Sequence, residues 1–248
     1  MTVLVEACVD SVESALAAEA GGASRVELCD NLVEGGTTPS AGMIAACRSR
    51  LSIPIFVLVR PRGGDFLFTA DELEVQVRDV AAARERGADG VVIGALRADG
   101  TVHREQTAAL MAAAGAMSVT FHRAFDVSRD PAESLDALMG LGVARVLTSG
   151  QAPSALVGAA TLAALVARGA GRIGILAGGG IHEDNVADIV ARSGVGEVHV
   201  RGTVVVESAM RFRSSRVSMG KAFAPDDYRR TVTDAERIRR IRERLSAA

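Results

Sequence analysis

Aromatic side chains and long apolar runs are both scarce in this sequence. Its 248 residues include no tryptophan, one tyrosine and seven phenylalanines, so the core must be built mainly from Val, Ile, Leu and Ala. No apolar run reaches the roughly 20 residues that a membrane-spanning helix needs. Glu6 and Asp10 interrupt the only early apolar run, so we expect no signal peptide and no association with membrane.

An excess of positive charge is also absent. The formal net charge of −2 at pH 7 gives no electrostatic basis for binding nucleic acid. The chain has only three cysteines, Cys8, Cys29 and Cys47, and no motif that would pair them. Without a secretory signal, they are expected to be reduced thiols of a cytoplasmic protein.

One local pattern, a short β-branched run followed by a helix-like stretch, repeats eight times. The runs are Val3–Cys8, Arg25–Cys29, Ile53–Arg60, Gly90–Leu96, Val119–His122, Arg145–Ser149, Ile173–Ala177 and Glu197–Arg201. Apolar strands that alternate with helices are typical of a parallel sheet covered by helices, and eight such units close into an α/β barrel, the (β/α)8 or TIM barrel. The alternative is an open doubly wound sheet, but no G-x-G-x-x-G turn follows the first run.

The pattern shows no domain boundary. We therefore predict a single barrel domain over residues 1–248. The stretch 203–227 lacks periodicity and is predicted to be irregular. A last helix is predicted at about 226–246, with Ile238 and Ile241 on its apolar face and arginines on the other.

Polar side chains gather where the eight runs end. In a TIM barrel the carboxyl ends of the strands form the mouth that carries the chemistry. The candidates there for ligand binding or acid–base chemistry include Glu6, Cys8, Glu27, Cys29, Arg60, Arg62, His122, Asp126, His199 and Arg201. The strand starts are expected to be apolar or to carry one outward polar residue.

An acid–thiol spacing occurs twice, as Glu6 and Cys8 and then, twenty-one residues later, as Glu27 and Cys29. Residues two apart on a strand share a face, and neighbouring strands lie about 4.8 Å apart. If both pairs point inward, the two thiols lie together at the rim and the two acids one layer below. Free cysteines are often plain core residues, and the acids could pair with arginines, so a structural role is left open.

Two histidines are candidate proton carriers. His122, in TFHRAFD, shares a face with Thr120 and is predicted to point into the mouth, and His199 occupies a similar place in EVHVRG. With Glu6, Glu27 and Asp126 they form the candidate catalytic set. A histidine held only by structural hydrogen bonds is the alternative for each.

Glycines follow the seventh and eighth runs. The loops at these places in TIM barrels often bind phosphate through backbone N–H groups. The candidate anion-binding set is Arg60, Arg62, Gly178, Gly179, Gly180, Arg201 and Gly202. A tight turn would also need glycine, so both explanations are kept.

Seven stretches, in this order, resemble the CutC family: EACVDS, RVELCDNLVEGGTTPS, VLVRPRGGDF, GADGVVIGAL, VTFHRAFD, RVLTSG and LAGGGI. The resemblance runs from residue 3 to about residue 220, where SMG at 218–220 also fits. It implies a TIM barrel, a cytoplasmic homo-oligomer (dimer or tetramer) and a role in copper homeostasis. It also implies Cu(I) bound through cysteines, here Cys8 and Cys29, and it indicates no organic cofactor.

One motif departs from the family pattern. His-x-Ser-Gly is usual after the eighth strand, whereas this chain has HVRG, with Arg201 in place of the serine. A cation there should favour an anionic ligand. The sequence is therefore compatible with two functions. The chain could bind Cu(I) through soft thiolates, or it could be an enzyme that acts on a phosphorylated or carboxylated small metabolite. The resemblance attaches no reaction to the chain, so the only partner expected besides another copy is a small ligand or metal ion at the mouth.

Overall fold

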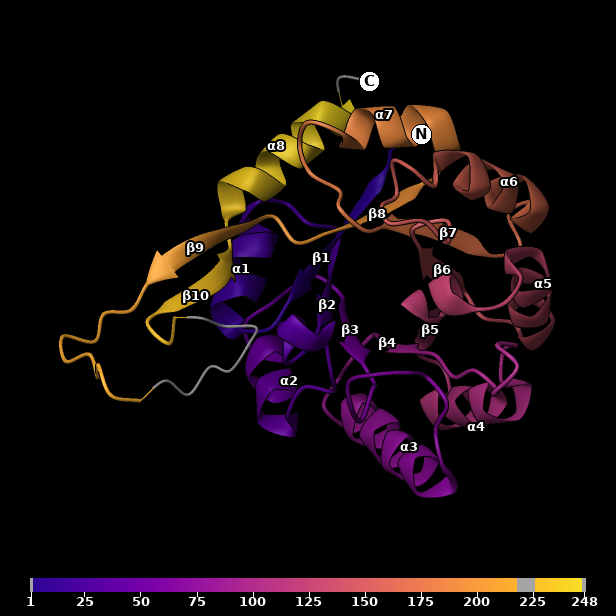
Figure 1. The fold of residues 1–248 in the computed structure, drawn as a ribbon, viewed down its shortest axis with the longest axis horizontal. Helices are drawn as coiled ribbons and strands as arrows, with labels where there is room; N and C mark the ends of the chain where they lie inside the picture. Colours follow the sequence, from indigo (N-terminus) through magenta and orange to yellow (C-terminus); the bar gives the residue numbers. More distant parts are fainter. Residues whose placement is uncertain (1, 218–225, 247–248) are drawn as a thin grey trace.

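The computed structural model describes residues 2–217 and 226–246, which form a closed barrel of eight parallel strands inside a ring of helices (Figure 1). The strands are β1 (Leu4–Val9), β2 (Arg25–Leu28), β3 (Ile55–Leu58), β4 (Gly90–Ile93), β5 (Ser118–Phe121), β6 (Arg145–Thr148), β7 (Gly174–Gly178) and β8 (Glu197–Val200). Each strand pairs with the next one along the chain, and β8 closes on β1. The predicted TIM barrel is confirmed. The SMG motif at 218–220 lies outside the described residues.

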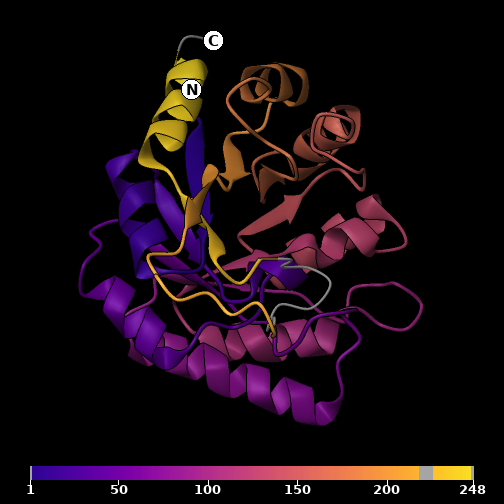
Figure 2. The same cartoon turned by 60° about the vertical axis from the view of Figure 1, so that its left-hand side comes forward.

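Helices connect the strands and cover the outside of the barrel, as the turned view also shows (Figure 2). They are α1 (Val12–Ala20), α2 (Ala41–Arg48), α3 (Ala70–Glu85), α4 (Arg104–Ala114), α5 (Pro131–Leu141), α6 (Ala159–Gly169), α7 (Val186–Ser193) and α8 (Ala235–Ser246), with short 3-10 turns η1 (Leu32–Glu34) and η2 (Arg123–Val127). Local sequence fixes several starts: the side chains of Ser11, Ser40, Thr69 and Asp130 each accept a hydrogen bond from the first helical turn. Within the described residues, no helix combines the length and apolarity needed to cross a membrane.

Side-chain alternation divides the buried residues into two groups. On β1, Val5, Ala7 and Val9 belong to the large core between the strands and the helices. A second, smaller cluster lies inside the barrel and consists of Cys8, Cys29, Phe56, Leu58 and Val92. Phe56 explains the glycine at position 90, because a Cβ there would come within 2.7 Å of its ring.

The region after β8 differs from its prediction. The segment predicted to be irregular contains β9 (Thr203–Glu207), which pairs antiparallel with β10 (Arg229–Thr233), and this arm extends away from the barrel in Figure 1. Because the chain first forms β10, helix α8 begins at Ala235 rather than near residue 226. Its apolar face is as predicted, with Ile238 and Ile241 fully buried. The arm exposes the apolar side chains of Phe212 and Val205. The expected homo-oligomer stays a prediction.

Candidate functional site at the barrel mouth

Two thiols meet inside the mouth. Cys8 near the end of β1 and Cys29 just after β2 lie on adjacent, hydrogen-bonded strands, and their Sγ atoms are 3.8 Å apart. Both side chains are buried, and all three cysteines of the chain are free thiols. Cys47 lies in α2, in the core between helices and strands. The two thiols are thus adjacent at the strand ends, with no disulfide to Cys47.

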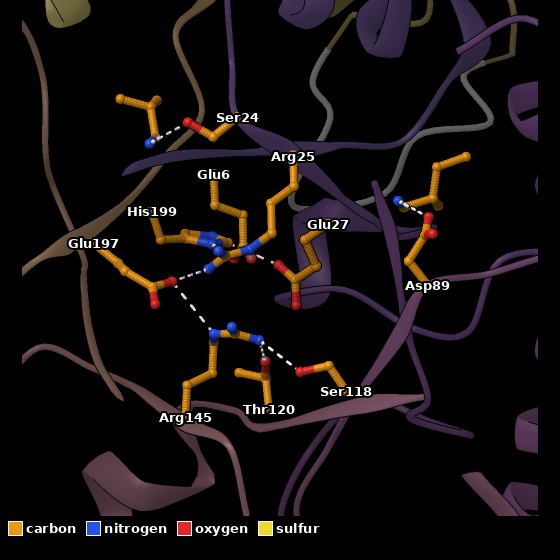
Figure 3. Close-up of polar contacts among 12 residues, drawn as sticks. Glu6, Ser24, Arg25, Glu27, Asp89, Ser118, Thr120, Arg145, Glu197 and His199 are labelled. Carbon is orange, nitrogen blue, oxygen red and sulfur yellow. Dashed lines mark hydrogen bonds and ion pairs between the residues drawn. The ribbon is translucent and has the colours of Figure 1, made fainter. Parts of the chain in front are cut away.

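An acid–imidazole group of Glu6, Glu27 and His199 lies next to Cys8, and Figure 3 shows these two acids and the imidazole. Nδ1 of His199 is 2.8 Å from Oε1 of Glu6, and its Nε2 is 3.6 Å from Oε2 of Glu27. Glu6 also forms a buried ion pair with Arg25. One ligand atom each from Cys8, Glu27 and His199 lies within 4.8 Å of the others, so this group could hold a metal ion.

A third layer, of charged side chains, closes the barrel interior beneath this group. Arg25 and Arg145 both pair with Glu197, and Arg145 donates hydrogen bonds to Ser118 (3.1 Å) and Thr120 (3.3 Å). These three charged residues begin β2, β6 and β8, so the expectation that strand starts carry no inward charge was wrong. The charges are tolerated because Glu197 and Glu6 together balance the two arginines and because both guanidinium groups lie over the ring of Phe56, 5.2 and 5.0 Å from its centre.

This arrangement fixes the charges of the acid and the imidazole. Burial alone would raise the pKa of Glu6, but the hydrogen bond with His199 and the charge of Arg25 outweigh it and lower this pKa to about 2. Burial would lower the pKa of His199, yet its hydrogen bonds with Cys8 and Glu6 outweigh this effect and raise it well above its usual value. At neutral pH, Glu6 is therefore a carboxylate and His199 an imidazolium.

Neighbouring groups also shift the pKa values of Cys8, Cys29 and Glu27, and they shift them in different directions. The hydrogen bond from Cys29 lowers the pKa of Cys8 well below its usual value, and the nearby His199 adds to this effect. Donating that hydrogen bond raises the pKa of Cys29 in turn. Burial and the charge on Cys8 raise the pKa of Glu27 well above its usual range. The arrangement therefore favours a thiolate at Cys8 beside the imidazolium and favours the protonated forms of Cys29 and Glu27.

His122 points into the mouth, on a wall of the cavity next to the thiols. Its Nδ1 accepts a hydrogen bond from the backbone N–H of Ala124 at 3.1 Å, and its Nε2 has no partner among the described residues. Burial and the charge of Arg60 lower its pKa to about 3, so the ring is neutral with a proton on Nε2. It offers a donor to a ligand and carries no charge of its own.

The predicted arginine clamps are held by the protein itself. Arg60 is buried and donates to the carbonyl oxygens of Glu34, Gly36 and Gly64 at 2.8–2.9 Å, and its guanidinium lies over the ring of Phe66. Arg62 is partly exposed and pairs with Asp65 and Glu72. Arg60 therefore organises two mouth loops, and Arg62 is turned toward its own loop and α3.

The carboxylate of Asp126 likewise accepts its hydrogen bonds from other protein groups. Its carboxylate accepts from the hydroxyl of Thr148, from the backbone N–H and hydroxyl of Ser149 (3.0–3.1 Å), and from Arg123 (2.7 Å). It ties η2 to the end of β6 and keeps Arg123 at the mouth. Arg201, by contrast, is exposed and forms no ion pair or side-chain hydrogen bond within the described residues.

Two cavities open at the mouth and share Cys8, Gly35, Arg123 and His199 as walls. The smaller, of about 250 Å³, contains the thiol pair, Glu27, Arg60 and His122. The larger, of about 400 Å³, lies against the loops after β7 and β8 and includes Gly179, Gly180, Arg201 and Gly202; Gly178 is not on its wall. A cavity of about 500 Å³ between α1 and α8 holds no thiol or imidazole and offers no comparable chemistry.

Comparison with known proteins gives the family. The model of the CutC family matches residues 3–204 of the chain. The chain belongs to the CutC family. A CutC family protein of Chromobacterium violaceum is 48% identical over 248 residues, which is the full length of both chains. The copper homeostasis protein cutC homolog of Homo sapiens is 46% identical over 96% of this chain and 87% of its own length.

A solved structure supports the same assignment. The crystal structure of CutC from Streptococcus agalactiae superposes with a TM-score of 0.77 and 34% identity, covering 80% of this chain and 98% of that one. The CutC-family chain therefore has its barrel in common with a solved relative.

Three residues of this CutC-family site were missed at the sequence level. Arg25 and Glu197 lie two residues before Glu27 and His199, so strand alternation already places them on the inner face. The alternation along β2 and β8 therefore predicts both inward side chains from the sequence. Arg145 stands alone on its strand, and its role follows only from the pairing with Glu197.

Proposed function

We propose that this CutC-family chain binds Cu(I) between Cys8 and Cys29 and serves copper homeostasis in the cytoplasm. The observation that carries the proposal is the pair of free, buried thiols 3.8 Å apart at the ends of adjacent strands. Soft sulfur ligands select Cu(I) over harder ions. The name of the human relative, a copper homeostasis protein cutC homolog, agrees with this choice of metal.

The distance between the sulfurs suits one shared ion. A thiolate–metal bond is about 2.3 Å long, so two sulfurs on opposite sides of an ion are at most about 4.6 Å apart. The pair would need to separate by less than about 1 Å, which small side-chain rotations supply. Cys8 is already a thiolate, so only Cys29 must lose a proton.

The surroundings can balance the charge of the complex. Two thiolates and one Cu(I) carry a net charge of −1, and a buried charge is costly unless a counter-charge is near. The imidazolium of His199 provides that charge next to Cys8, and Glu6 keeps it protonated. His199 therefore acts as a counter-ion rather than as a metal ligand.

A different metal set exists in the same place. Cys8, Glu27 and His199 together offer S, O and N ligands of the kind that Zn²⁺ accepts. However, the pKa values of His199 and Glu27 are both raised, so protons compete with Zn²⁺ for these two ligands, whereas the pKa of Cys8 is lowered in favour of the thiolate that Cu(I) binds. We therefore favour Cu(I) at the two sulfurs.

A competition titration tests this proposal. Under anaerobic conditions, a chromophoric Cu(I) chelator is titrated against wild type, Cys8→Ser, Cys29→Ser and the control Cys47→Ser, and Zn²⁺ is titrated separately. We expect wild type and Cys47→Ser to withdraw one equivalent of Cu(I) and each mouth variant to lose at least about tenfold in affinity. Equal Cu(I) binding by all four proteins, or tight binding of Zn²⁺ only, would overturn the proposal.

A further inference from the structure

The loops after β7 and β8 have the features of a second site, next to the cysteine pair and with Cys8 as a shared wall. We propose that they bind the phosphate group of a small organic phosphate monoester, whose organic part extends into the cavity that contains Cys8 and His122. This role goes beyond copper binding. Four observations carry it: backbone donors without acceptors, a cation without an ion pair, two adjoining cavities with shared walls, and a buried donor at the far wall of the second cavity.

Backbone N–H groups in these loops have no acceptor in the protein. Within the described part of the chain, the N–H groups of Gly180, Ile181 and Gly202 donate no hydrogen bond. Ile181 and Gly202 are buried, and a buried N–H without an acceptor costs free energy comparable to a lost hydrogen bond. Gly180, Ile181 and Gly202 all line the larger cavity, and several unpaired donors at one cavity fit a group with several acceptor oxygens, such as phosphate, better than a single carbonyl.

The charge at this cavity is also unbalanced. Arg123 and Arg237 line it, but Asp126 and Glu183 neutralise them. Arg201 lines the same cavity and has no ion-pair partner among residues 2–217 and 226–246. The charge of Arg201 acts on Asp10 and Cys8 only at a distance, so an anion bound by the backbone donors would give it a direct partner.

The shape of the mouth indicates an ester rather than the free ion. The cavity against the loops measures about 400 Å³ and shares walls with the cavity of about 250 Å³ that holds Cys8 and His122. At the far wall, the Nε2 proton of His122 is buried without an acceptor. A ligand that spans both cavities would satisfy this donor with a hydroxyl or carbonyl oxygen while its phosphate lies on the loops.

Variants at Gly180 and Arg201 separate a charge effect from a change of shape. Gly180 has a φ of 71°, a conformation that Asn and Asp tolerate better than other side chains, and a Cβ there would make only ordinary contact, at 3.5 Å, with Ser154. Gly180→Asp therefore adds a negative charge at the loop, and Gly180→Asn is its neutral control. Arg201→Gln removes the free cation, and Arg201→Lys retains it.

The measurement is binding of glycerol 3-phosphate and ribose 5-phosphate to the metal-free full chain by ³¹P NMR titration, with inorganic phosphate and glycerol as reference probes. We expect an ester to bind more tightly than inorganic phosphate, glycerol not to bind, and Gly180→Asp and Arg201→Gln to weaken the ester about tenfold relative to their controls. Equal binding of the ester by Gly180→Asp and Gly180→Asn would overturn the phosphate site. Inorganic phosphate binding as tightly as both esters would overturn the ester assignment.

Discussion

Nδ1 of His199 lies 2.8 Å from Oε1 of Glu6, and Arg25 holds the same carboxylate from the other side. The series Arg25–Glu6–His199 runs from the closed end of the barrel interior to the thiol pair. Arg25 keeps Glu6 ionised and Glu6 keeps His199 protonated, so the positive charge beside Cys8 depends on two side chains that line neither mouth cavity.

We predict that Glu6→Gln lowers the pKa of His199, because the neutral amide no longer stabilises the imidazolium. The imidazole titration can be followed by NMR of its ring nitrogens. The same change leaves Arg25 with less compensation and should lower the free energy of unfolding by about 3–5 kcal/mol, measured in urea. Glu197→Gln is the control: it should also destabilise the protein but leave the His199 pKa high. An unchanged His199 titration in Glu6→Gln would show that the series has no such role.

A second prediction concerns acid stability. The pKa of His122 is about 3 in the folded protein and 6.5 for an ordinary histidine, so between these values the unfolded chain binds a proton that the folded chain does not. The contribution of His122 to stability should therefore fall as the pH drops from about 6.5 toward 3, by about 1.4 kcal/mol per pH unit, while Glu27, whose raised pKa acts with the opposite sign above pH 4.5, opposes it equally in wild type and in His122→Asn. His122→Asn should lack this contribution between pH 6.5 and 5, a window above the Glu6 titration, whose range runs from 4.5 down to about 2. Parallel stability–pH curves for the two proteins would contradict this account of His122.

A third prediction separates two arginines that look alike in the sequence. Arg60→Lys should lower the free energy of unfolding by about 2–3 kcal/mol, because a lysine cannot reach three carbonyl oxygens in one plane and leaves buried acceptors unpaired. Arg62→Lys should cost less than about 1 kcal/mol, because its ion pairs are partly exposed. Chemical denaturation of both variants checks the contrast, and a similar loss in each would refute it.

Alternation along the strands made much of this site predictable from the sequence. The inward placement of Glu6, Cys8, Glu27 and Cys29 follows from a period of two and from the order of neighbouring strands. The same rule places Arg25 on the inner face, because it lies two residues before Glu27 on β2.

Contacts between loops could not be predicted in this way. Arg60 and Arg62 differ because the backbone carbonyls of Glu34, Gly36 and Gly64 surround only one of them, and that depends on loop conformation. The ion pairs of Glu197 join residues far apart in the sequence, so no local pattern shows them. Likewise, β9 and β10 form a sheet only with each other, across a long connection that has no periodicity.

The most direct test of the central claim is the copper K-edge X-ray absorption spectrum of the full chain loaded anaerobically with one equivalent of Cu(I). The account predicts a first shell dominated by two sulfur neighbours, unchanged in Cys47→Ser and lost in Cys8→Ser/Cys29→Ser. A first shell of nitrogen and oxygen only, or the same sulfur shell in the double variant, would contradict it.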